Sequence, residues 1–347
     1  MNSLQALPQW QEHMSEPTGA WLGFINAIYY VGTASNAPIA AAVNNKFGRK
    51  VGVYTGYLML ILGVALCGPN SEAAFLMSRF FVGCSTAYFT NAVPLLMNEI
   101  AYPTHRGIVS ALFMSGWSVG GTLAAFITFG TRNMQSSWAW RIPTICQLIV
   151  PMIALPGLLM CPESPRWLIS MNRTDEARVV LQDIHAGGAD DSPLVDYEVS
   201  EISNAITIER EISANASYLD MIKTRGNRHR LFISISLGVF SQWCGNGVVS
   251  YYLAMVLTTV GVTSVTDQTL ISVGLNIWNL LWSIAAAFSV DRLGRRPLFF
   301  ASVATMLVGY VIVTALSGAF ANSGQSATGI AVIPFLFVFF AGYDLAM

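Results

Sequence analysis

A group of amide and aromatic side chains is the part of this sequence best suited to bind a small molecule. They interrupt one apolar stretch and are Gln242, Trp243, Asn246, Tyr251 and Tyr252. A carboxamide offers hydrogen-bond donors and an acceptor together, which matches sugar hydroxyls, and an aromatic ring can stack on a pyranose. Asn276 and Asn279, three residues apart in the next stretch, share one helical face. The pattern predicts a sugar site, although such amides equally often join neighbouring membrane helices.

One cation lies inside an apolar stretch. Arg79 follows the start of the stretch 73–101 by six residues. An unpaired cation in a membrane is costly, and an ionisable residue there is functional by default. Alternatively, Arg79 lies near the outer boundary of the membrane and extends its guanidinium to water. The residues alone leave both interpretations open.

Two short basic turns repeat one motif. Gly48-Arg49-Lys50 follows Asn45 after one apolar stretch, and Gly294-Arg295-Arg296 follows Asp291 after another. Glycine permits the tight turn, and the basic side chains hold it in the cytoplasm. The two copies indicate a duplicated membrane unit. Asp291 can form an ion pair where Asn45 can only hydrogen-bond, so we expect the second turn to carry the stronger charge network.

A further charged pair flanks a turn. Glu99 and Arg106 lie on either side of Pro103, close enough to meet each other or one of the basic turns. Such a pair could break and re-form as two helical bundles move. It could also be a solvated pair worth about 0 to 1 kcal/mol. Taken alone, the solvated pair is the simpler interpretation.

These side chains need elements to position them, and the hydropathy pattern predicts helices that span a membrane. A spanning helix needs about 20 apolar residues. Nine stretches qualify or nearly qualify: 18–44, 51–69, 73–101, 107–131, 140–161, 230–259, 266–290, 297–321 and 327–347. If they alternate in direction, 15 of the 18 basic residues fall on one side, which is then the cytoplasmic side. This orientation places Met1 outside, and the predicted fold class is an all-α membrane protein.

Composition supports a membrane protein and excludes several functions. The chain is 54% hydrophobic and 11% charged, with a mean hydropathy of +0.53, too few charges to cover a soluble surface. More than half of the charged residues lie in 163–229, which we expect to form short amphipathic helices in the cytoplasm, one of them capped by Thr174. The net charge of -1 indicates no nucleic-acid partner. Without a Ser/His/Asp set, a metal cluster or a phosphate loop, we expect no enzyme activity, cofactor or metal.

Taken together, the motifs resemble the sugar porter family of the major facilitator superfamily, and look most like its fungal hexose and lactose transporters. The matching segments are Gly48-Arg49-Lys50, Arg79 with Gly83, Glu99 to Gly107, Pro162 to Leu168, Gln242 to Tyr252 and Asp291 to Arg296. The resemblance implies two six-helix bundles joined by a cytoplasmic insert. Mapped on that fold, the chain would hold about nine of twelve helices, from after helix 1 to within helix 10. The expected domains are an N-terminal bundle over 1–161, an insert over 162–229 and a C-terminal bundle over 230–347.

The resemblance also implies residue roles. Gln242, Asn246 and Asn279 would bind the sugar, with Trp243, Tyr251 and Tyr252 beside it as stacking and outer-gate residues. Arg79 would belong to proton coupling, with its acidic partner in helix 1. A cytoplasmic latch would comprise Gly48, Arg49, Glu99, Arg106, Glu163, Arg166, Asp291, Gly294 and Arg295. Asn45, Met114 and Ser241 depart from the family pattern, so an ordinary glucose site is not expected.

The sequence therefore predicts a multi-pass plasma-membrane protein that transports a neutral hexose or disaccharide by alternating access. Its partners would be the sugar, protons in the complete protein, and the lipid bilayer. The alternatives to a transporter are a transporter-like sugar sensor and a nonfunctional fragment of a transporter. An enzyme is the least favoured hypothesis.

Overall fold

The computed structural model describes residues 2–189, 192–214, 217 and 219–345, and within these ranges every regular element is helical. Helices α1 to α8 are Asn2–Gln5, Pro8–His13, Gly19–Phe47, Arg49–Ala65, Glu72–Ile100, Arg106–Thr131, Trp138–Cys146 and Ile149–Met160, with a 3-10 turn at Pro103–His105. Helices α9 to α12 are Pro165–Ser170, Thr174–His185, Pro193–Ala214 and Asp220–Lys223. Helices α13 to α19 are Arg225–Trp243, Asn246–Tyr251, Leu253–Thr259, Val265–Leu293, Arg295–Ser323, Ser326–Ile330 and Val332–Asp344.

These helices form two compact units. Unit 1 contains the residues up to 26, residues 114–147 and the residues from 235 onward, and unit 2 contains residues 27–113 and 148–234. Long helices such as α3 and α6 pass from one unit to the other. The expected domain boundaries at 161 and 229 follow the family's bundles, and they stay a prediction.

Six helices in the described part of the chain are long and apolar enough to cross a membrane. They are Glu72–Ile100, Pro103–Thr131, Trp138–Met160, Val265–Ala286, Arg295–Ser323 and Ala327–Asp344. The other three expected stretches are helical too. Of these, α3 carries polar residues such as Asn26 and Asn36, α4 has only 17 residues, and the stretch 230–259 is divided into α13, α14 and α15. The apolar signal is therefore weaker where amides and glycines interrupt it.

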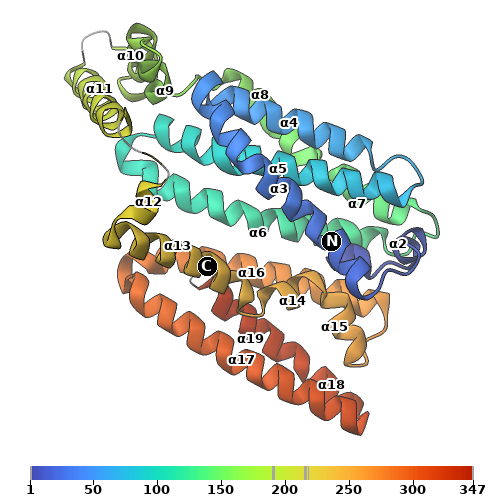
Figure 1. Cartoon of the computed structure of the whole chain (residues 1–347). Helices are drawn as coiled ribbons and strands as arrows, with labels where there is room; N and C mark the ends of the chain where they lie inside the picture. The colour runs from blue at the N-terminus through green and yellow to red at the C-terminus, as the bar shows by residue number, and fades with distance from the viewer. Residues whose placement is uncertain (1, 190–191, 215–216, 218, 346–347) are drawn as a thin grey trace. The chain divides into compact units, whose positions relative to one another are not determined.

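Glycines bring the helices of unit 2 close together. In this unit α4 and α5 run side by side (Figure 1). Between α3 and α5, a Cβ atom on Gly83 would lie 2.0 Å from the Tyr29 carbonyl oxygen, and one on Gly32 would lie 2.3 Å from the Phe80 carbonyl oxygen. Only glycine allows such an approach of two backbones, which is how membrane helices pack where no hydrophobic effect drives them together.

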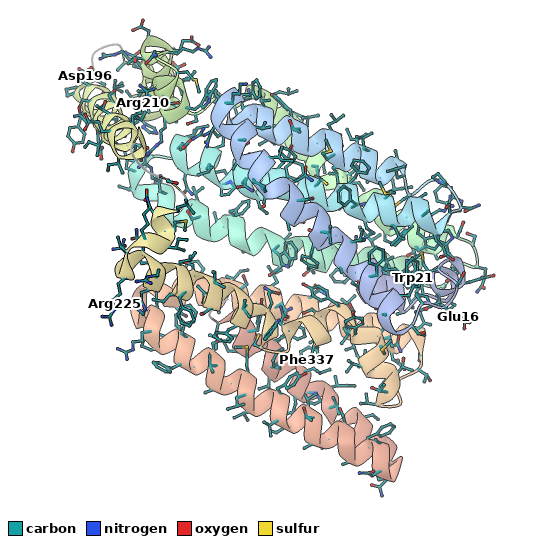
Figure 2. The ribbon with its side chains drawn as sticks, viewed as in Figure 1. Glu16, Trp21, Asp196, Arg210, Arg225 and Phe337 are labelled. Carbon is teal, nitrogen blue, oxygen red and sulfur yellow. The ribbon has the colours of Figure 1, made fainter. Side chains whose placement is uncertain are left out.

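Helices α9, α10 and α11 form a small cluster of their own within unit 2. Their shared core is Leu168, Ile169, Ala177, Leu181, Val195, Val199 and Ile206. Asp196 of α11, labelled in Figure 2, pairs with Arg178 of α10 at 2.7 Å. The amphipathic helix expected near Thr174 is present, but Thr174 is its first residue rather than its cap. Asn172 adopts a φ of 61°, and the turn that it forms leaves Arg173 in the cap position without a capping side chain.

The core of unit 1 lies around α19. This helix runs beside α17 and also contacts α16 (Figure 1). Leu336 and Phe339 are fully buried in it. Phe337, labelled in Figure 2, accepts a hydrogen bond at its carbonyl oxygen from Trp278 Nε1 at 2.8 Å. Because α19 packs on α16, the polar residues on the facing sides of these two helices are held at fixed positions relative to one another.

Candidate functional site

A glycine break places Asn246 at the start of α14. Gly245 has a φ of +98°, and a Cβ atom there would lie 2.6 Å from the Tyr310 ring. The backbone therefore turns between α13 and α14 in a way that other residues would strain. Asn246 is 8% exposed, its side-chain oxygen accepts a hydrogen bond from Ser250 Oγ at 2.6 Å, and it interacts with Tyr343.

Asn279 is the central residue of α16, and it faces an acid of α19. The amide is assigned with its nitrogen toward two acceptors, the Leu275 carbonyl oxygen at 3.0 Å and Asp344 Oδ2 at 3.2 Å, because the opposite orientation would set its oxygen against both. Asp344 follows Tyr343, so α19 brings two predicted sugar ligands, Asn246 and Asn279, to the same short segment. We call Asn246, Asn279, Tyr343 and Asp344 the amide cluster.

Of the other predicted sugar-site residues, Tyr251 lies near Tyr343 of this cluster. Gln242 and Trp243 end α13, and both side chains are exposed, Trp243 by 81%. Tyr251 lies against Gly247, and a Cβ atom on Gly23 would be 3.5 Å from the Tyr252 hydroxyl. The structure brings Tyr252 next to α3 rather than into the amide cluster.

Asn276 joins helices, as the alternative interpretation of the amides predicts. Its side-chain nitrogen donates to the Ser272 carbonyl oxygen at 2.7 Å, and its own carbonyl oxygen accepts from Thr122 Oγ1 of α6 at 3.1 Å. A Cβ atom on Gly121 would lie 2.6 Å from its side-chain oxygen. Of the two asparagines on this helical face, Asn279 reaches the amide cluster, and Asn276 packs against α6.

The first basic turn has a buried acidic partner on another helix. Arg49 Nε and Nη2 donate to the two Glu99 carboxylate oxygens at 3.0 and 3.1 Å, and the side chains are only 11% and 13% exposed. Ser164 Oγ also donates to Glu99, and Arg49 Nη1 donates to the Asn44 carbonyl oxygen at 3.1 Å. The first turn therefore has a charged partner of its own, supplied by α5, and the comparison of its charge network with that of the second turn stays a prediction. Of the partners left open for Glu99, the structure shows Arg49 of the basic turn rather than a solvated pair with Arg106.

A second carboxylate caps the helix that begins at this turn. Glu163 accepts from the backbone nitrogens of Arg49 and Lys50, both at 3.1 Å, and so satisfies two donors that the start of α4 leaves free. A negative charge is favourable there because the helix dipole is positive at its N-terminus. Gly48 has a φ of +103°, and a Cβ atom would lie 2.4 Å from Glu163 Oε2. We call Gly48, Arg49, Lys50, Glu99, Glu163 and Ser164 the basic-turn cluster.

Two other predicted latch residues of unit 2 have different partners. Arg106 is exposed and donates to the Ala101 carbonyl oxygen at 3.4 Å, and Arg166 pairs with Glu209 of α11 at 2.5 Å in an exposed position. In the second turn, Gly294 has a φ of +81° and Arg295 is exposed. The side chain of Asp291 lies outside the described residues.

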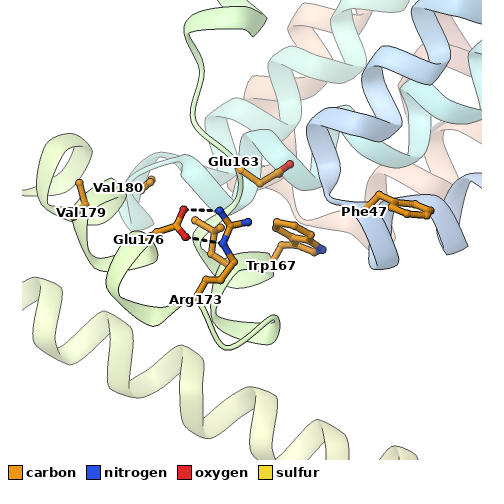
Figure 3. A pocket seen from close by; sticks show the side chains of 8 residues that line it. Phe47, Glu163, Trp167, Arg173, Glu176, Val179 and Val180 are labelled. Carbon is orange, nitrogen blue, oxygen red and sulfur yellow. Dashed lines mark hydrogen bonds and ion pairs between the residues drawn. The ribbon is translucent and has the colours of Figure 1, made fainter.

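A cavity of about 490 Å³ lies beside the basic-turn cluster, lined by Phe47, Glu163, Trp167 and others (Figure 3). Two charged residues of its lining, Arg173 and Glu176, bond to each other at 2.6 and 2.7 Å. This hydrogen bond lowers the pKa of Glu176. Trp167 Nε1 donates to the Asn45 carbonyl oxygen at 3.0 Å, which ties α9 to the basic turn.

Arg79 lies on α5, and its guanidinium stands over the Tyr29 ring at 5.1 Å from the centroid. Its Nε is buried without a hydrogen-bond partner in the described part of the chain. The Tyr29 hydroxyl donates to Thr86 at 2.9 Å, so the ring that faces Arg79 is held in place.

Known proteins resemble this chain over most of its length. A family model described as "Sugar (and other) transporter" matches residues 1–347. A high-affinity glucose transporter of Kluyveromyces lactis is 27% identical over 298 residues, which cover 86% of this chain and 54% of that protein. A glucose transporter of Aspergillus flavus is 29% identical over 285 residues, which cover 79% of this chain and 53% of that protein. The chain thus spans about half the length of these relatives.

Solved structures show the fold. The proton:xylose symporter XylE bound to 6-bromo-6-deoxy-D-glucose superposes with a TM-score of 0.78 at 22% identity, over 99% of this chain and 76% of that one. A partially occluded inward-open form of the Escherichia coli xylose transporter also gives 0.78, at 20% identity. The fold is that of the major facilitator superfamily, and the described chain contains part of it.

Proposed function

The chain belongs to the family of sugar (and other) transporters, and on that premise we propose that it moves a neutral sugar across a membrane by alternating access. The substrate would be a hexose or a disaccharide, and the membrane the plasma membrane. The observation that carries this proposal is the amide cluster, in which Asn246 of α14 contacts Tyr343 and Asn279 of α16 contacts Asp344, the next residue of α19.

The amide cluster suits hydroxyl groups. The two N–H donors of Asn279 are directed at Leu275 and Asp344, so its oxygen is the atom left to accept a bond from a sugar hydroxyl. The oxygen of Asn246 already accepts from Ser250 and its side chain also bonds to Tyr343, which leaves one N–H of its nitrogen to donate. A hydroxyl can both donate and accept, so one sugar ring could bridge the two amides. Gln242, Trp243, Tyr251 and Tyr252 would complete the site from α13 and α14.

The basic-turn cluster would act as part of a latch on the cytoplasmic face. Its bidentate ion pair and its helix cap both depend on Glu99 and Glu163 keeping their places beside α4. We propose that Arg106, Arg166, Asp291, Gly294 and Arg295 contribute to the same latch as the protein changes state. Arg79 would take part in proton coupling, which is supported by a relative of the same fold being named a proton:xylose symporter.

The test separates sugar binding from sugar movement. Binding of radiolabelled hexoses and disaccharides is measured on the purified chain, and uptake is measured in cells that lack their own sugar carriers. We expect saturable binding that weakens about tenfold or more in Asn279→Ala, since a buried partner group is lost. Asn322→Ala, an exposed asparagine of α17, is the matched control and should bind as the wild type does.

The outcomes distinguish the alternatives. Binding together with uptake supports a transporter, and binding without uptake supports a sensor or a nonfunctional fragment. Absence of binding for every neutral sugar, or equal binding by wild type and Asn279→Ala, would contradict the proposed site.

A further inference from the structure

Asp344 is an acid at the last position of a spanning helix, Ala327–Asp344. It is the only charged residue of the span Ala327–Asp344, whose other residues are apolar, small or hydroxyl-bearing. Its carboxylate accepts from Asn279, the central residue of the 29-residue α16. The contact places the carboxylate at the middle level of a spanning helix, where an ionisable residue is functional by default.

The neighbours of Asp344 include no cation in the described part of the chain. The ion pairs found there do not involve this carboxylate. The titratable groups near this end of α19 are Tyr343 itself, Cys244, Tyr251 at the end of α14, and Tyr310 on α17, all of them uncharged when protonated. The packed helices also carry Asp267 on α16 and Arg295 and Arg296 on α17, and none of these forms an ion pair with Asp344 in the described part of the chain. Among the described residues, an ionised Asp344 would be a partly buried charge without a counter-ion, whereas a neutral Asp344 gains an O–H donor.

We propose that Asp344 is a proton-carrying acid at the sugar site, in addition to the proton coupling proposed for Arg79, and that it binds one proton together with the sugar. The proposal rests on the proposed sugar-binding function and deepens it. Asn279 donates to one carboxyl oxygen in both protonation states and so positions the group. In its neutral form the carboxyl donates its O–H to a sugar hydroxyl. The carboxylate takes the proton from water on one side of the membrane and releases it to water on the other side, and no covalent bond of the sugar changes.

Proton and sugar binding must then favour each other. If the neutral acid binds the sugar better, the bound sugar raises the proton affinity of Asp344 by the same factor. Sugar affinity is full at low pH and falls as the pH rises through the range in which the carboxyl ionises. We expect a decrease of about fivefold or more, the lower end of couplings between linked sites. Sugar binding in weak buffer should also take up protons.

The decisive experiment compares Asp344→Asn with wild type on the purified chain. Sugar titrations that follow tryptophan fluorescence are made across a pH series, with a pH indicator to record proton uptake. Asp344→Asn keeps a polar side chain beside Asn279 but cannot titrate, so its sugar affinity should be independent of pH and its proton uptake absent. Asp344→Glu should retain both. Asp267→Asn, an exposed acid in the first turn of α16, is the matched control and should behave as wild type.

A second measurement does not need the sugar. Infrared spectra of wild type minus Asp344→Asn should contain a carboxylic-acid C=O band in weakly acidic buffer that is replaced by a carboxylate band in alkaline buffer. An unchanged pH dependence in Asp344→Asn, or a carboxylate band at every pH, would overturn the proposal. Failure of the wild type to bind any sugar would instead contradict the proposed function, and the infrared result would still decide whether Asp344 holds a proton.

Discussion

Removal of the Glu99 charge tests whether the basic-turn cluster stabilises the protein. Glu99→Gln keeps the shape of the side chain but replaces one carboxylate oxygen that accepts from Arg49 with an amide nitrogen. Arg49 then keeps its charge in a site where it is only 11% exposed. Ser164 also loses a charged acceptor.

The size of the effect follows from burial. Breaking a buried ion pair by removing one partner costs about 3 to 5 kcal/mol, and we expect Glu99→Ala near the lower limit because a little of each side chain reaches the surface. Glu99→Gln retains part of the hydrogen bonding and should cost about 1.5 to 3 kcal/mol, the range for one bond to a charged group. In a double-mutant cycle, Arg49 and Glu99 should therefore couple strongly.

The assay is denaturant unfolding in detergent micelles, followed by tryptophan fluorescence. Asp196→Asn serves as the matched control, since Asp196 pairs with Arg178 at 2.7 Å with both side chains about half exposed. Exposed pairs contribute about 0 to 1 kcal/mol, so this variant should unfold nearly as wild type does. If Asp196→Asn and Glu99→Gln lose equal stability, or if Arg49 and Glu99 show no coupling, the burial argument fails.

Three further predictions concern other parts of the chain. Gly83→Ala should destabilise the protein strongly, because its Cβ atom would lie 2.0 Å from the Tyr29 carbonyl oxygen. Gly107→Ala is the control and should not destabilise it, since a Cβ atom there would have no neighbouring atom within 4 Å. Thermal unfolding of the two variants and the wild type measures the difference. Burial raises the pKa of the Cys161 thiol, so its alkylation should be slow at neutral pH and accelerate only in alkaline buffer, and equal rates in folded and denatured protein would refute this. Asn172, in the sequon Asn172-Arg173-Thr174, should carry no glycan because we expect a cytoplasmic position, and mass spectrometry that finds one would reverse the predicted topology.

The sequence predicts what depends on local patterns and misses what depends on which helices meet. Apolar stretches and the two glycine turns indicate the helices and their breaks, since hydropathy and backbone freedom are local properties. The sequence leaves Glu99 a choice between Arg106 and a basic turn, and only tertiary packing selects Arg49, which lies 50 residues away on another helix. Asn276 and Asn279 have the same residue type and share a helical face, so the sequence cannot tell their roles apart. Packing does: Asn276 contacts Gly121 and Thr122 of α6, whereas Asn279 belongs to the amide cluster.

Two residues of the site had a signal that sequence reasoning did not use. Asp344 is an acid in an otherwise uncharged apolar stretch, and the rule that singled out Arg79 applies to it equally. Ser164, whose hydroxyl accepts from the Trp167 backbone nitrogen as the cap of α9, precedes a proline in a typical helix start. Its bond to Glu99 comes from tertiary packing alone.

Photo-crosslinking tests the central claim most directly. A hexose that carries a small photoreactive group is irradiated with the purified chain, and the modified peptides are identified by mass spectrometry with and without excess unmodified sugar. The account predicts labels on α14, α16 or α19 near Asn246, Asn279 and Tyr343, which excess sugar abolishes and Asn279→Ala reduces. Labels confined to unit 2, or labels that excess sugar leaves unchanged, would contradict a sugar site at the amide cluster.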